Sequence, residues 1–66
     1  MRNKEELTEY LNDFFNNYGF NQRDLSRKSK ISFVTINNIV KGKIDKTLRA
    51  KTVLALEKAV EELKKL

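Results

Sequence analysis

The chain has 66 residues, 14 basic and nine acidic side chains and a net charge of +5, and it contains neither Cys nor His. This length predicts one domain (residues 1–66) near the lower limit for folding without disulfides or metal, with roughly 60% of the extended-chain surface buried. The missing residue types exclude disulfides, Cys/His zinc sites and thiol or imidazole catalysis. Because so small a core leaves little room for an enclosed pocket, we expect no enzyme, no cofactor and no small-molecule ligand.

The positive charge is concentrated in the middle of the chain. Residues 22–51 hold nine of the basic residues and two of the acidic ones, whereas residues 1–21 are net acidic and residues 52–66 are neutral. Clustered basic charge is typical of proteins that bind nucleic acid, although a lysine-rich solubilising surface gives the same pattern. No signal peptide or apolar stretch of membrane-spanning length is visible. We therefore expect a cytoplasmic protein, associated with the nucleoid if it binds DNA, with no membrane partner.

Apolar periodicity predicts a first helix over residues 4–18. Its acidic residues lie in the first turns, where the helix dipole favours negative charge, and Gly19 suits a left-handed C-terminal cap. The aromatic residues in the apolar stripe of this helix could stack on bases, but the helical spacing of the stripe favours a core face. The stripe consists of Leu7, Leu11, Phe14, Phe15 and Tyr18.

Two short helices follow, predicted over residues 22–29 and 33–41. Asn21 and Ser32 are favourable N-caps, and Gly42 suits the end of the second helix. Only residues 30–32 connect the pair, and two short helices joined by a turn of three or four residues form a helix-turn-helix unit. The apolar anchors of the unit are Leu25 in its first helix and Ile36, Ile39 and Val40 in its second.

A long fourth helix is predicted over residues 46–65, capped by Asp45 or Thr47. The last turns, around Val60, Leu63 and Leu66, would overhang the shorter helices and either pair with a second subunit, forming a homodimer through the C-terminal helix, or fray. The predicted fold is therefore all-α, a compact bundle of four to five helices with a helix-turn-helix and a long C-terminal helix. The apolar stripe of that helix is Leu48, Thr52, Ala55, Leu56, Ala59, Val60 and Leu63.

Residues 22–42, Q-R-D-L-S-R-K-S-K-I-S-F-V-T-I-N-N-I-V-K-G, resemble the helix-turn-helix of the lambda-repressor-like superfamily. The Gln-x-x-Leu opening and the closing Gly are similar to the phage-repressor (XRE-type) branch. The run from Ile31 to Ile39 follows the Val-Ser-aromatic-x-Thr-Val-Ser-x-Val pattern of the Lac-repressor branch. The sequence departs from these patterns at the turn, where Lys30 replaces Gly, and after Leu25, where Ser26 replaces Ala.

The resemblance implies that the second helix of the pair lies in the DNA major groove while the first crosses the backbone. Asn38 is then the best candidate to pair with adenine, whereas Phe33 and Val34 could contact the thymine methyl group, so we expect A·T-rich positions in the target. Base contacts are expected from Ser32, Phe33, Val34, Asn37 and Asn38. Phosphate contacts are expected from Asn21, Gln22, Arg23, Arg27, Lys28, Thr35, Lys41, Lys43 and Lys46.

The resulting functional prediction is a sequence-specific double-stranded DNA-binding protein. A transcriptional regulator or repressor fits it, and so does an engineered or de novo DNA binder, because the sequence has strong helix formers and clean caps and lacks Pro. A second interpretation is a protein–protein interaction module on the same scaffold, anchored by Phe33 and Val34. RNA would satisfy the charge, but its deep, narrow major groove excludes a recognition helix.

Overall fold

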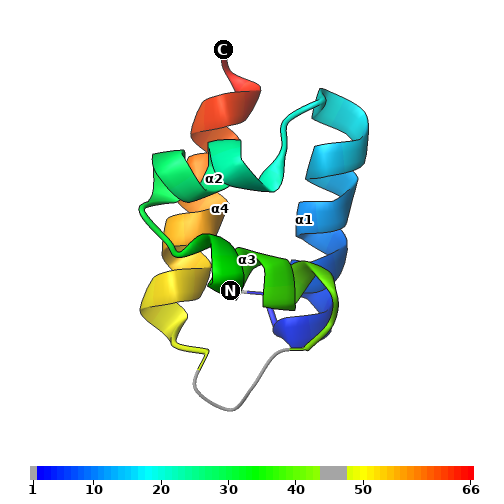
Figure 1. Cartoon of the computed structure of the whole chain (residues 1–66), viewed down its shortest axis with the longest axis vertical. Coiled ribbons are helices and arrows are strands. Elements are labelled where there is room, and N and C mark those ends of the chain that lie inside the picture. The colour runs from blue at the N-terminus through cyan, green and yellow to red at the C-terminus, as the bar shows by residue number, and fades with distance from the viewer. Residues whose placement is uncertain (1, 44–47) are drawn as a thin grey trace.

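The computed structural model describes residues 2–43 and 48–66, which form four α-helices and no strand. They are α1 (Lys4–Tyr18), α2 (Gln22–Ser29), α3 (Phe33–Val40) and α4 (Ala50–Lys64). In Figure 1, α1 and α4 run in the same direction, while α2 and α3 lie across them on the near side of the molecule. The predicted small all-α bundle is confirmed. None of the four described helices is long and apolar enough to span a membrane.

Local capping explains where the first helices begin and end. At the start of α1, Asn3 and Glu6 form a reciprocal capping box, in which each side chain accepts a hydrogen bond from the other residue's backbone N–H. Gly19 ends the helix with φ of 75°, in the left-handed region that favours glycine. The bounds of α1 and α2 agree with the prediction, and α3 ends one residue earlier than predicted because Lys41 is its C-cap.

The core is formed by one buried face of each helix. Phe14 is its largest fully buried side chain and stacks on the half-buried Phe20, with ring centroids 5.4 Å apart. Because Phe20 lies beyond Gly19, this contact holds the α1–α2 junction against the core. The other buried side chains are Leu7 and Leu11 of α1, Leu25 of α2, Ile36 and Ile39 of α3, and Val53, Leu56, Ala59, Val60 and Leu63 of α4.

Three predictions for the fourth helix need correction. It begins at Ala50 rather than at residue 46, because residues 48–49 are not helical and Arg49 occupies the N-cap in an extended conformation. The buried stripe includes Val53, whereas Thr52 and Ala55 are only half-buried. Val60 and Leu63 do not overhang, because they are buried in the core where α1 and α2 pack against α4; of the predicted overhang only Leu66 is exposed. The proposed caps Asp45 and Thr47 lie outside the described residues.

A polar cluster joins the exposed edges of α1 and α4. The Arg2 guanidinium pairs with Glu57 and lies 3.7 Å from the centre of the Tyr10 ring. The Tyr10 hydroxyl donates a hydrogen bond of 2.6 Å to Glu61. Partial burial and this hydrogen bond raise the pKa of Tyr10, and the same hydrogen bond, helped by Lys64, lowers the pKa of Glu61. The cluster stabilises the contact between the first and last helices, on elements outside the helix-turn-helix.

Candidate nucleic-acid interface

The turn between α2 and α3 is built from local hydrogen bonds around one strained residue. Lys30 adopts φ of 60° and ψ of 25°, and its backbone N–H donates to the Ser26 carbonyl at 2.9 Å. The Ser26 hydroxyl donates to the Ile31 carbonyl at 2.7 Å. Ser26 thus satisfies its half-buried hydroxyl where the related pattern has Ala. Because the backbone at Lys30 is left-handed, the chain changes direction directly after α2, and α3 begins only three residues later, at Phe33.

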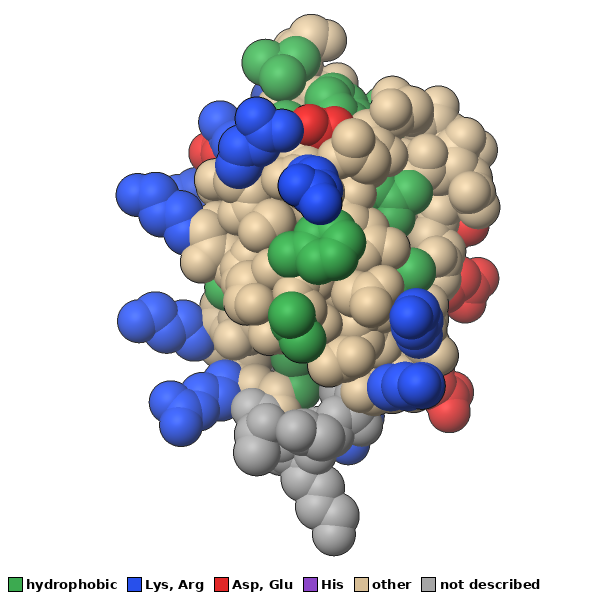
Figure 2. Space-filling view, viewed as in Figure 1, with side chains coloured by type: hydrophobic (Ala, Val, Ile, Leu, Met, Phe, Trp, Pro, Cys, Tyr) green, Lys and Arg blue, Asp and Glu red, His purple; other side chains and the backbone are tan. Residues whose placement is uncertain are grey.

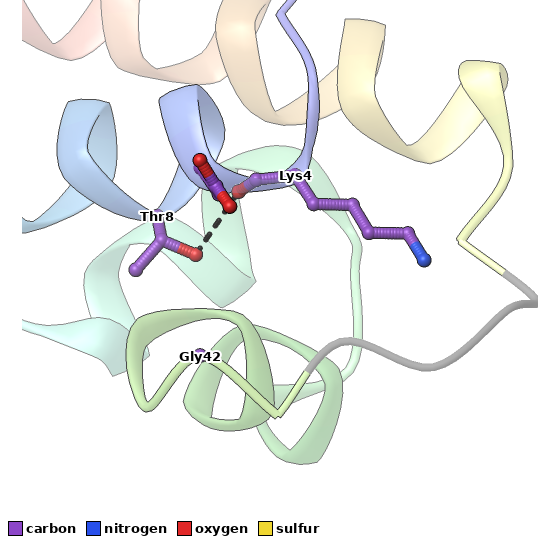
Figure 3. A pocket seen from close by; sticks show the side chains of 4 residues that line it. Lys4, Thr8 and Gly42 are labelled. Atoms are coloured by element: carbon purple, nitrogen blue, oxygen red, sulfur yellow. Dashed lines mark hydrogen bonds between the residues drawn. The ribbon is translucent and has the colours of Figure 1, made fainter.

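The C-terminal end of α3 is anchored on α1. The Thr8 hydroxyl lies 2.8 Å from the Ile39 carbonyl and 3.1 Å from the Lys4 carbonyl, and it can donate its single proton to either. Asn12 donates from its side-chain amide to the Val40 carbonyl at 3.3 Å. Lys4, Thr8 and Gly42 line an open hollow beside this contact, and Figure 3 shows the Thr8 hydroxyl turned towards the Lys4 carbonyl while the Lys4 side chain extends away from Gly42. Because side chains of α1 satisfy these last carbonyls, α3 is fixed in orientation with its N-terminal turn directed away from α1.

The outward side of α3 begins with two apolar residues. Phe33 is 42% exposed and Val34 is 64% exposed, while Ile36 and Ile39 take the core positions of the same helix. Asn38, one turn after Val34, is also exposed, and Asn37 is half-buried. Ser32 caps the helix by accepting a hydrogen bond from the Val34 N–H at 3.2 Å. We call the four exposed residues Ser32, Phe33, Val34 and Asn38, together with the half-buried Asn37, the readout face.

A cation and an aromatic ring meet at the α2–α3 junction. The Arg23 guanidinium lies 5.6 Å from the centre of the Phe33 ring, within the range of a cation–π interaction. Together with Ser26 and Arg27 these two residues line an open hollow between the helices. No short sequence pattern could have indicated this pairing, because the two residues are brought together only by the angle at which α3 crosses α2.

Positive charge surrounds the readout face. Figure 2, which looks onto α2 and α3, shows apolar patches in the middle of this surface, blue side chains over it and at its rim, and red mainly at one edge. Arg27 lies 3.6 Å from Asp24, and Lys28 lies 3.5 Å from Glu62 of α4. Both pairs are solvent-exposed and therefore weak, so these cations can exchange their partners for phosphates at little cost. Lys41 and Lys43, which follow α3, are exposed.

The N-terminus of α2 presents further hydrogen-bond donors. Asn21 and Asp24 form a capping box with hydrogen bonds of 2.9 and 3.0 Å, which occupies the Asn21 amide oxygen and leaves its NH₂ group as the available donor. The N–H groups of Gln22 and Arg23 belong to the first turn and have no acceptor within the helix. The Gln22 side-chain oxygen is buried, and within the described residues no donor reaches it.

The structure places most of the predicted contact residues on two adjacent helices, α2 and α3. The five residues of the readout face lie on α3 or its cap, and the predicted phosphate contacts Asn21, Gln22, Arg23, Arg27 and Lys28 lie on α2 or its cap. Thr35 is half-buried, which makes it a poorer candidate for a phosphate contact than the lysines. Lys46 lies outside the described residues. The sequence identified Ser26 only as a replacement for Ala, whereas in the structure it also lines the hollow beside Phe33.

Comparison of the chain with protein-family models, curated proteins and solved structures gave no match. The site must therefore be interpreted from its own chemistry. Within residues 2–43 and 48–66, no three acidic side chains gather closely enough to hold a metal ion. What the surface offers is a helix end with apolar and amide side chains, exposed cations on both sides of it, and helix-terminal N–H groups.

Proposed function

We propose that the chain is a sequence-specific double-stranded DNA-binding domain that inserts α3 into the major groove. The observation that carries the proposal is the combination of an exposed α3 N-terminal turn with cations on both flanks. A groove-reading helix needs its first residues free of the domain's own packing, and Phe33, Val34 and Asn38 meet that requirement. The resemblance of residues 22–42 to the lambda-repressor-like superfamily supports the same function, and we include membership of that superfamily in the proposal.

The cations and the amide have separate roles in this proposal. Arg23, Arg27 and Lys28 on one flank, and Lys41 and Lys43 on the other, neutralise phosphates and supply affinity without sequence information. Asn38 pairs through its amide with the N6 and N7 atoms of an adenine, a bidentate contact that contributes about 1–3 kcal/mol of discrimination. The α2 N-terminus adds N–H donors for a phosphate, strengthened by the helix dipole.

In this proposal the domain regulates transcription by occupying its site on the DNA, and a repressor is the simplest form of such a regulator. A homodimer through α4 belongs to the same proposal. Because Val60 and Leu63 are buried within the subunit, Leu54 and Leu66, which are 56% and 90% exposed, are the apolar residues of that region available to a second copy. Sedimentation with and without a two-half-site duplex measures this directly.

The first experiment is selection of bound duplexes from a random double-stranded library at roughly physiological salt, followed by titration of the selected duplex. Enrichment of one half-site supports the proposal. Lys41→Ala should then reduce the slope of log K against log salt by about 0.9 for its lost phosphate contact. Lys58→Ala is the matched control, because it removes the same charge from the exposed side of α4 and should leave the slope unchanged.

The exposed Phe33 and Val34 also favour a second candidate, a protein-interaction module in which these two side chains anchor the partner. The two functions differ in their response to salt. Binding that weakens steeply with salt and with loss of Lys41 supports DNA as the partner. If the library yields no enriched sequence and binding to DNA is only bulk and salt-sensitive, the DNA-reading proposal fails and the protein partner becomes the better interpretation.

A further inference from the structure

The first turn of α3 has an unusual composition for a surface that reads bases. Its two outward residues, Phe33 and Val34, carry no hydrogen-bond donor or acceptor in their side chains. In the major groove every base edge shows donors or acceptors, and the one apolar group on display is the C5-methyl group of a pyrimidine. Two apolar side chains placed there can therefore discriminate between bases only through that methyl group.

These side chains are held at the surface by the structure around them. Ile36 and Ile39 fill the core positions of α3, so the core has no place for Phe33 or Val34. The Ser32 hydroxyl accepts from the Val34 N–H and fixes the first turn. The Arg23 guanidinium lies over the Phe33 ring, 5.6 Å from its centre. This cation–π contact restrains the ring.

The spacing between Val34 and Asn38 is also suitable for contacts with two nearby bases. Val34 and Asn38 are four residues apart and therefore share one side of α3, about 6 Å from each other along the helix axis. That separation corresponds to roughly two base-pair steps, each about 3.4 Å. A methyl-bearing pyrimidine contacted by Val34 would thus lie close to, and distinct from, the adenine that Asn38 is proposed to bind.

We propose that the apolar turn formed by Phe33 and Val34 binds the C5-methyl group itself, so that 5-methylcytosine satisfies this contact as thymine does, whereas uracil and unmethylated cytosine do not. This inference rests on the proposed DNA-binding function and specifies what part of the DNA it reads. Covering one methyl group with apolar surface is expected to change the affinity about fourfold.

The experiment uses the full chain and the duplex selected from the random library. Each thymine of the half-site is replaced in turn by uracil, which removes only the methyl group, and the dissociation constant is measured by fluorescence anisotropy. At one or two positions the affinity should fall about fourfold. At those positions a cytosine·guanine pair and a 5-methylcytosine·guanine pair are then compared, and the methylated pair should bind about fourfold more tightly.

Two variants assign the effect to the protein. Val34→Ala and Phe33→Ala shorten the apolar turn at exposed positions, and at least one of them should reduce the thymine-to-uracil ratio towards one. Tyr18→Ala is the control, because it removes a half-exposed side chain of α1, outside the helix-turn-helix, and should preserve the ratio. Circular dichroism melting verifies that each variant is folded before its ratio is interpreted.

The outcomes separate this inference from the proposed function. If the chain binds its selected duplex specifically but no thymine-to-uracil change alters the affinity, the methyl inference is wrong while the DNA-binding function stands. The inference is also wrong if both alanine variants keep the fourfold ratio, because other groups would then read the methyl. If no duplex is selected at all, the DNA-binding function and the inference fail together.

Discussion

Replacing Lys30 by Gly should stabilise the protein, because Lys30 holds a left-handed backbone conformation with φ of 60°. An L-residue in that region places Cβ too close to the following carbonyl oxygen, and glycine has no Cβ. The backbone hydrogen bond from Lys30 to Ser26 does not involve the side chain and is preserved in the variant. Lys41 provides the matched position, because it is also an exposed helix C-cap but has φ of −84°.

The magnitude follows from two opposing terms. Relief of the left-handed strain contributes about 1–2 kcal/mol. Glycine increases the conformational entropy of the unfolded chain, which costs about 0.4–1 kcal/mol. Lys30→Gly should therefore stabilise by up to about 1.5 kcal/mol, whereas Lys41→Gly gains no relief and should destabilise by about 0.4–1 kcal/mol. The difference between the two variants cancels the entropy term and the loss of one positive charge, and equals the strain, about 1–2 kcal/mol.

The assay is thermal and urea unfolding of both variants, monitored by the circular dichroism signal of the helices. For a domain of this size 1 kcal/mol corresponds to about 4–8 °C, so Lys30→Gly should melt at least about 4 °C above Lys41→Gly. Equal melting temperatures would refute the argument, because they would mean that the turn stores no backbone strain at Lys30. The unfolding m-values should agree between the variants, since neither side chain belongs to the core.

Three further perturbations test the packing and the electrostatics. Asn21→Ala removes the capping box of α2 and should cost about 1 kcal/mol in urea unfolding. Leu25→Ala truncates the one buried side chain of α2 and should lower the free energy of unfolding by about 2–5 kcal/mol, detected as a large fall in melting temperature or the loss of a cooperative transition. Tyr10→Phe deletes the hydrogen bond to Glu61, so the pKa of Glu61 should rise towards its ordinary value in a carboxyl NMR titration. Because the pKa of Glu61 is lower in the folded state, its ionised carboxylate stabilises the fold above the unfolded-state pKa, and this stabilisation is lost as the pH falls through the folded-state pKa. The Tyr10→Phe variant should therefore lose less stability than the parent protein on acidification.

The sequence determined the elements whose signals are local. The spacing of Leu7, Leu11 and Phe14 specifies the inner face of α1, and Gly19 ends it because glycine tolerates the positive φ there. Asn21 and Ser32 fix the starts of α2 and α3 through hydrogen bonds to residues two or three positions away. Charge clustering, the short connection between the two helices and the resemblance of residues 22–42 to the lambda-repressor-like motif together selected the surface now proposed to bind DNA.

Contacts between residues far apart in the sequence were decided by the tertiary structure. The start of α4 depends on Leu48, which packs against the core in a non-helical segment, and helical periodicity could not distinguish that from a first turn. Val53 is buried because of how α4 is rotated against α1 and α2. The Arg23–Phe33 contact and the anchoring of Ile39 by Thr8 depend on the angles between helices. Such angles result from the packing of whole faces, whereas caps and periodicity act within one or two helical turns.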